Sequence, residues 1–117
     1  MKYQKGRDVS FTESLPSAVE KLIAAVNAQD REGFVGAFTP DAVIDDWGHR
    51  VVGHDEIRAW NECEFSGPDV RIDVTRVERP GQTIVLTVLT SRGTSRSSSH
   101  VAFDIDDDIV TRMTIRA

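Results

Sequence analysis

The first patterned stretch of the chain is an apolar stripe with a helical period. Its members recur at spacings of three, four and seven residues: Val19, Leu22, Ile23 and Val26. This spacing places them on one face of an α-helix. Ser17 and Glu20 have the spacing of a capping box, in which each side chain accepts a hydrogen bond from the other residue's backbone. The sequence therefore predicts a capped helix that begins near Pro16, a residue tolerated at helix starts.

A second and shorter helix is predicted after Asp30, whose carboxylate can cap it. Its glycines, Gly33 and Gly36, lower the intrinsic helix propensity, so tertiary packing must hold it. The apolar residues that we expect it to carry are Phe34, Val35, Ala37 and Phe38.

Residues 41–60, DAVIDDWGHRVVGHDEIRAW, combine a β-hairpin with the start of a third helix. The pattern predicts a strand at 42–47, a turn at 48–49 and a short return strand at 50–52. The third helix is expected from about residue 54 to 64. One face of this helix carries Ile57, Trp60, Asn61 and Glu64.

The rest of the chain alternates apolar and polar residues with the period of β-strands. Strands are predicted around residues 70–75, 84–89, 101–105 and 109–116, separated by turns that contain proline, glycine or aspartate. The last turn, residues 106–108, consists of three aspartates that we expect to be solvated. Helices followed by an antiparallel meander are typical of the α+β class.

Composition and charge narrow the function classes. The chain has 117 residues and a net charge of −5, which disfavours binding to nucleic-acid phosphates or to an anionic membrane surface. No apolar run approaches the ~20 residues that span a bilayer, and the first residues lack the apolar stretch of a signal peptide. We therefore expect a cytoplasmic protein. Residues 1–15 are predicted as an N-terminal arm and 16–117 as a single domain.

Three motifs in residues 24–60 support a resemblance to a known superfamily. An amphipathic helix ends in a Gln-Asp pair at 29–30, a Pro-Asp-Ala segment follows the short helix at 40–42, and the hairpin leads into Gly-x-x-x-Ile at 53–57. In these motifs and in its element order, the chain resembles the nuclear transport factor 2-like superfamily. This group includes ketosteroid isomerase and the polyketide-cyclase-like, or SnoaL-like, proteins.

The resemblance implies a cone-shaped, strongly curved antiparallel or mixed β-sheet wrapped around three N-terminal helices, in a cystatin-like arrangement. It also implies an apolar pocket inside the cone. A homodimer through the outer face of the sheet is a further implication. Candidates for that face are Thr83, Val85, Thr87 and Leu89.

In the isomerases of this superfamily, a carboxylate at the end of the first strand acts as the general base. The resemblance places this carboxylate at Asp46 or at Asp45, depending on the landmark from which the residues are counted. Adjacent strand residues point to opposite faces. If Ile44 points inward, Asp46 does too, so we favour Asp46 as the base for cofactor-free isomerase-, cyclase- or dehydratase-type proton transfer. His49 or Glu64 could assist it. The alternative is that both aspartates are solvated at the strand end.

The isomerases also use a tyrosine on the first helix and a protonated acid on a late strand to stabilise an oxyanion. The resemblance places these positions at Leu22 and near Val101, whose side chains cannot donate a hydrogen bond. Loss of one such donor typically lowers the rate by ~10²–10³. We therefore expect no isomerase activity by that mechanism.

We expect the pocket to bind a hydrophobic or aromatic small molecule. The predicted lining residues are Phe38, Ile44, Trp47, Ile57, Trp60, Asn61, Glu64, Phe103 and Met113. The alternative is that large side chains fill this space, in a non-catalytic ligand-binding or dimerisation module. The set Asp45, Asp46, His49 and His54 matches no metal-ligand spacing, so neither a metal site nor a cofactor is expected.

Overall fold

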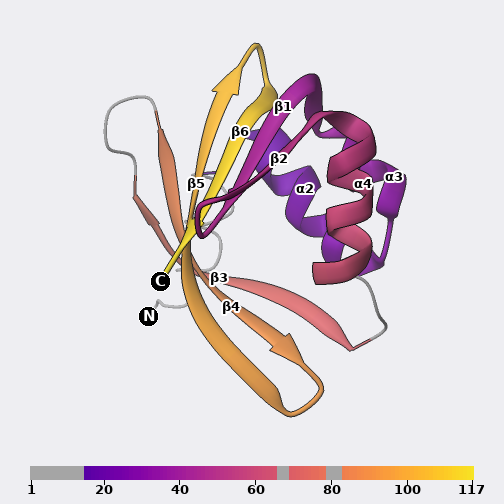
Figure 1. The fold of residues 1–117 in the computed structure, drawn as a ribbon. Helices are drawn as coiled ribbons and strands as arrows, with labels where there is room; N and C mark the ends of the chain where they lie inside the picture. The colour runs from indigo at the N-terminus through magenta and orange to yellow at the C-terminus, as the bar shows by residue number, and fades with distance from the viewer. Residues whose placement is uncertain (1–14, 66–68, 79–82) are drawn as a thin grey trace.

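The structure is a computed structural model that describes residues 15–65, 69–78 and 83–117. Three helices and six strands make up this part of the chain (Figure 1). The predicted N-terminal arm lies outside the described residues, apart from residue 15. None of the described helices has the length and apolar character to cross a membrane. The cytoplasmic location stays a prediction.

The first helix, α2 (Ser17–Ala28), begins where the sequence predicts it, but its cap is different. No side chain of the helix caps it locally, so the capping-box prediction is wrong. Instead the carboxylate of Asp108 accepts hydrogen bonds from the Ser17 hydroxyl at 2.7 Å and from the Ala18 N–H at 3.3 Å. The acidic turn therefore has a structural role, because one of its aspartates occupies the positive end of this helix.

The second helix, α3 (Arg31–Gly36), is capped as expected by Asp30, whose carboxylate accepts a hydrogen bond from the Gly33 N–H at 3.0 Å. The prediction that this helix carries Phe38 is wrong, because Phe38 is the first residue of strand β1. There Phe38 pairs with Val110 in the sheet. Long-range strand pairing thus overrides a helical tendency that the two glycines already weaken.

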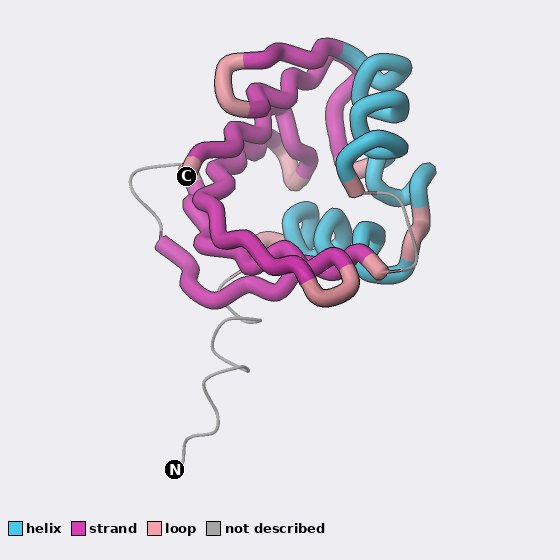
Figure 2. The backbone as a smooth tube through the Cα atoms, turned by 60° about the horizontal axis from the view of Figure 1, so that its bottom comes forward, coloured by secondary structure: helices cyan, strands magenta, loops and turns pink. Residues whose placement is uncertain are grey.

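Six strands form one mixed sheet in the order β2-β1-β6-β5-β4-β3. Only the contact between β1 and β6 is parallel among the described pairs. The bounds are β1 (Phe38–Asp46), β2 (His49–Val52), β3 (Val70–Glu78), β4 (Ile84–Arg92), β5 (Ser95–Asp106) and β6 (Ile109–Arg116). Figure 2 shows the sheet curving strongly around an interior, with the helices on its open side. This is the predicted cone-shaped α+β fold.

The hairpin between β1 and β2 turns one residue earlier than predicted. Trp47 and Gly48 form the turn, with φ values of 54° and 91°. Two positive φ values are typical of a type I′ turn, which suits the twist of paired strands. Trp47 therefore leaves the strand, and its side chain is 61% exposed.

The core lies between the inner face of the sheet and the helices. Alternate strand residues supply it, as the period of two predicts, and α2 covers it with its predicted stripe. The third helix, α4 (Gly53–Glu64), adds Ile57 and Trp60. An aromatic group joins the helices to the strand, since Phe34 contacts both Phe38 and Trp60 with ring centroids 5.2 and 6.2 Å apart.

Candidate functional site

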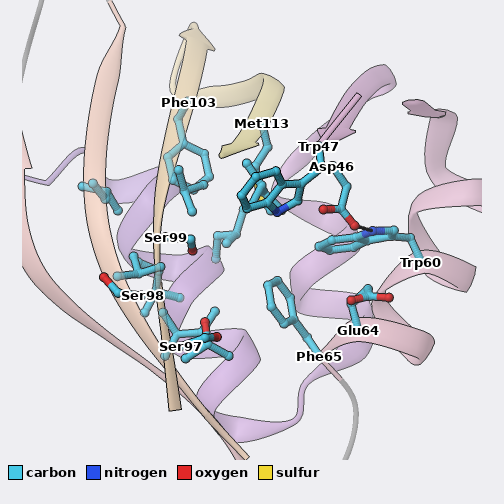
Figure 3. A pocket seen from close by; sticks show the side chains of 18 of the residues that line it. Asp46, Trp47, Trp60, Glu64, Phe65, Ser97, Ser98, Ser99, Phe103 and Met113 are labelled. Atoms are coloured by element: carbon cyan, nitrogen blue, oxygen red, sulfur yellow. Dashed lines mark hydrogen bonds between the residues drawn. The ribbon is translucent and has the colours of Figure 1, made fainter. Parts of the chain in front are cut away.

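A cavity of about 310 Å³ lies between the inner face of the sheet and helices α2 and α4 (Figure 3). Its walls come from alternate residues of the long strands, and their register places these residues in rows. Phe103 pairs with Met113, and Val101 pairs with both Leu86 and Ile115. All five side chains line the cavity. Most of the wall is therefore apolar, because the strand period sends every second side chain inward.

Asp46 lies on the inner face of the sheet and lines the cavity. It is the last residue of β1, paired with Ile115 of β6. The Trp60 indole N–H donates a hydrogen bond of 3.1 Å to Asp46 Oδ2 (Figure 3). Trp60 itself is held edge-on against Phe65, with centroids 5.0 Å apart. A rigid aromatic donor thus orients a carboxylate at the edge of an apolar space.

Asp45 lies on the opposite, outer face of the sheet and is buried. Its carboxylate accepts two hydrogen bonds from Arg116, at 3.1 and 3.2 Å, and one from Arg112 at 3.2 Å. The Gly48 N–H also donates to it at 2.8 Å. The Arg116 hydrogen bond and then the Gly48 N–H lower the pKa of Asp45 below its ordinary value. Asp45 is therefore held ionised in a structural network.

The histidines lie outside the cavity wall. His49 is an exposed residue of β2 that pairs directly with Asp46 across the hairpin but does not line the cavity. His54 is half-buried, with Nε2 2.8 Å from the Phe38 carbonyl oxygen. The side chains of the described residues form no cluster of three or more metal-ligating groups.

The structure brings together five of the predicted pocket residues and separates the other four. Trp47, Trp60, Glu64, Phe103 and Met113 line the cavity. The remaining residues, Phe38, Ile44, Ile57 and Asn61, do not line it and are buried elsewhere in the fold.

The residues that the sequence groups on one face of α4 do not all meet the cavity, and Asn61 is an example. Its side chain lies beside Ala25 and Val26 of α2, and its Oδ1 is buried without a hydrogen-bond partner in the described residues. Trp60 and Glu64, one helical turn apart, face the cavity instead. The helical period places Trp60, Asn61 and Glu64 on one broad face of α4. The packing of α4 against the rest of the fold decides which flank of that face meets the cavity.

A polar part of the wall was missed from the sequence. Thr90 and Arg92 at the end of β4 line the cavity, together with three consecutive serines of β5. The serines are Ser97, Ser98 and Ser99. The sequence does contain a signal for this polar part of the wall. Thr90 and Arg92 continue the alternation that directs Leu86 and Val88 inward.

Leu22 and Val101 both line the cavity. The resemblance to the isomerases places their two oxyanion donors at these positions, which are apolar here. An oxyanion at Asp46's end of the cavity would therefore meet hydrocarbon from these two residues rather than hydrogen-bond donors.

Comparisons with solved structures show the fold. An uncharacterised cystatin-fold protein from Novosphingobium aromaticivorans matches with a TM-score of 0.77 and 19% identity, over 86% of this chain and 96% of that one. Rv0760c from Mycobacterium tuberculosis, in complex with estradiol-17β-hemisuccinate, matches with a TM-score of 0.73 and 17% identity, over 84% and 88%. A computationally designed 17-OHP binder matches with a TM-score of 0.72 and 17% identity, over 86% and 87%.

The curved sheet and three helices, together with a match to a SnoaL-like family model, place the chain in the nuclear transport factor 2-like superfamily. Within it, the model of the SnoaL-like domain matches residues 19–117. The chain belongs to the SnoaL-like family. No curated protein sequence matches the chain significantly.

Proposed function

We propose that this protein binds an apolar, ring-containing small molecule in the cavity, with the Asp46 carboxylate as a polar anchor. The observation that carries the proposal is the cavity of about 310 Å³, in which an oriented carboxylate interrupts an apolar wall. Sites for small molecules are typically concave and apolar with a few polar groups that fix orientation.

The structural neighbours support this ligand class. One neighbour is in complex with a steroid ester and another was designed to bind 17-OHP. Identities of 17% show only a shared fold. We therefore use the ligands of these neighbours only as probes of a suitable size and shape. Estradiol is such a probe, because it is apolar, rigid and ring-containing.

Proton transfer by Asp46 is the second candidate function, favoured by the placement of this carboxylate. Among the described residues, Trp60 donates the side-chain hydrogen bond that the Asp46 carboxylate accepts, and this bond involves only Oδ2. Oδ1 can therefore take a proton from a bound C–H acid. Since Leu22 and Val101 supply no oxyanion donor, we rank ligand binding above isomerase chemistry.

Two measurements test these functions. Estradiol titrated into the protein should give saturable binding by calorimetry, and the absence of binding would contradict the pocket assignment for this ligand class. Bound androstenedione in deuterated water should then exchange its acidic C–H protons if Asp46 is a base. Asp46→Asn should lower this exchange by about 10²-fold or more, the usual contribution of a general base.

Asp41→Asn is the matched control, since Asp41 is an exposed residue of the same strand. It should leave the exchange rate unchanged. Steroid binding without exchange would define a carrier. Exchange that survives Asp46→Asn would refute the general-base role.

We also propose that the protein forms a homodimer through the outer face of β4 and β5. Val85, Leu89 and Ala102 are half-buried side chains on this face. An apolar face of this kind is commonly covered in solution by a partner. Light scattering on a size-exclusion column should give a dimer mass, and Val85→Lys should give a monomer. The exposed residue Ala59 of α4 provides a control, Ala59→Lys, that should remain dimeric. A monomeric wild type would refute this part.

A further inference from the structure

The cavity has a second polar end, formed where β4 ends and β5 begins. Thr90, Arg92, Ser97 and Ser99 lie on this end of the wall. Thr90 and Ser97 are direct partners across the two strands, so their side chains point to the same face of the sheet. Their hydroxyl groups therefore converge on one part of the cavity.

The strand register gives the distance between the two polar ends along the strand direction. Asp46 pairs with Ile115, which pairs with Val101 of β5. Ser97 precedes Val101 by four residues on the same strand, which is about 14 Å at ~3.4 Å per residue. In Figure 3 the serines lie across the cavity from Trp60. The apolar wall between the two ends can thus hold a rigid ring system with a polar group at each end.

Arg92 supplies positive charge to this end. Its guanidinium donates a hydrogen bond to the backbone carbonyl of Glu64 at the end of α4. No ion pair joins it to a carboxylate in the described ranges 15–65, 69–78 and 83–117. A guanidinium has five N–H donors. Most of its donors therefore remain available to a ligand.

Other arginines of the protein are used differently. Arg112 and Arg116 are paired with Asp45 on the outer face, and Arg58 with Glu32 on the helices. Arg92 combines a position on the cavity wall with an unpaired charge and neighbouring hydroxyls. This donor set matches an anionic oxygen group, because charge-assisted hydrogen bonds to such a group are the strong ones.

We propose that Arg92, Thr90 and Ser97 form a subsite for a carboxylate or sulfonate group carried by the apolar ligand, at the end opposite Asp46. This inference rests on the proposed binding function and adds the chemical class of the ligand: an amphipathic organic anion. The carboxylate of Glu64, which also lines the cavity, opposes the anion and limits its affinity.

A matched pair of fluorescent probes tests the subsite separately from the pocket. Anilinonaphthalene sulfonate and phenylnaphthylamine share an aromatic body, and only the first has an anionic group. Wild-type protein should bind the sulfonate about tenfold more tightly at low salt, and the preference should decrease as salt screens the charges. Arg92→Gln should remove this preference and leave the affinity for phenylnaphthylamine within about twofold.

Arg96→Gln is the control, since Arg96 is an arginine of the same hairpin that is exposed, as Arg92 is, but does not line the cavity. It should keep the preference. Glu64→Gln should increase the affinity for the sulfonate by about threefold, because a like charge is removed.

The outcomes separate the two proposals. Equal affinity of the wild type for both probes would overturn the anion subsite and leave the pocket intact. An equal loss of affinity for both probes in Arg92→Gln would show that Arg92 only connects β4 to α4. This result would also overturn the anion subsite. If neither probe binds, the pocket itself is refuted and the subsite with it.

Discussion

Asp45 and Asp46 are adjacent in the sequence but lie in opposite environments. Asp45 is buried on the outer face of the sheet, where two arginines and a backbone N–H bind its carboxylate. Asp46 is half-buried on the inner face and receives the Trp60 indole N–H beside an apolar cavity. One step along a strand therefore separates a structural carboxylate from one that can meet a ligand.

The difference shows how to interpret a pair of acidic residues at a strand end. A carboxylate whose lone pairs are already used by cations stabilises the hairpin and the last strand, and it has little capacity for chemistry. A carboxylate with one donor and a neighbouring cavity retains that capacity. We expect substitutions of the two residues to affect different properties of the protein.

Asp45→Asn should give the larger loss of stability. The substitution keeps the shape but removes the charge that pairs with Arg112 and Arg116. We expect the melting temperature at pH 7 to fall by the order of 5 °C, against about 1 °C or less for Asp46→Asn. Thermal denaturation followed by circular dichroism measures both. Equal losses for the two variants would show that the comparison is wrong.

The pH dependence of stability sharpens the comparison. The pKa of Asp45 is lowered in the folded protein from its ordinary value of 3.8, first by Arg116 and then by the Gly48 N–H. A lowered pKa means that the folded state binds fewer protons, so its stabilising effect is present above pH 3.8 and is lost as pH falls through the folded value.

The difference in melting temperature between wild type and Asp45→Asn should therefore be largest near neutral pH and decrease on acidification below about pH 4. Thermal scans from neutral to acidic pH measure it. The Asp41→Asn variant should show no such trend, because Asp41 is exposed on the same strand. A difference that is constant over the whole range would argue against the ion pairs as its cause.

Substitution of Trp47 should have the smallest effect, and it should raise stability while it lowers ligand affinity. It has a φ of 54° at the turn, a conformation that asparagine adopts more readily than a bulky aromatic residue. Trp47→Asn should raise the melting temperature by about 1–2 °C. Since the indole lines the cavity next to Asp46, estradiol affinity should fall about threefold.

Gly48→Ala, at a φ of 91°, is the contrasting change in the same turn. It should lower stability, because alanine does not tolerate that backbone conformation. A Trp47→Asn variant that loses stability would show that the indole serves packing rather than the ligand.

The sequence by itself determined the order of the helices and strands, the apolar stripe of α2, and the inward alternation that builds the cavity wall. These features follow from local periodicity, so neighbouring residues are enough to predict them. The Asp30 cap belongs to the same group, because its partner Gly33 is three residues away.

Only the tertiary structure decided which aspartate faces the cavity, which flank of α4 meets it, and where Arg92 and the serines come together. It also placed Asp108 on the first turn of α2, 90 positions away from its partner Ala18. These features depend on strand register, on the place of the hairpin turn and on helix packing. A shift of one residue in any of them exchanges inside for outside, and no local pattern distinguishes the two.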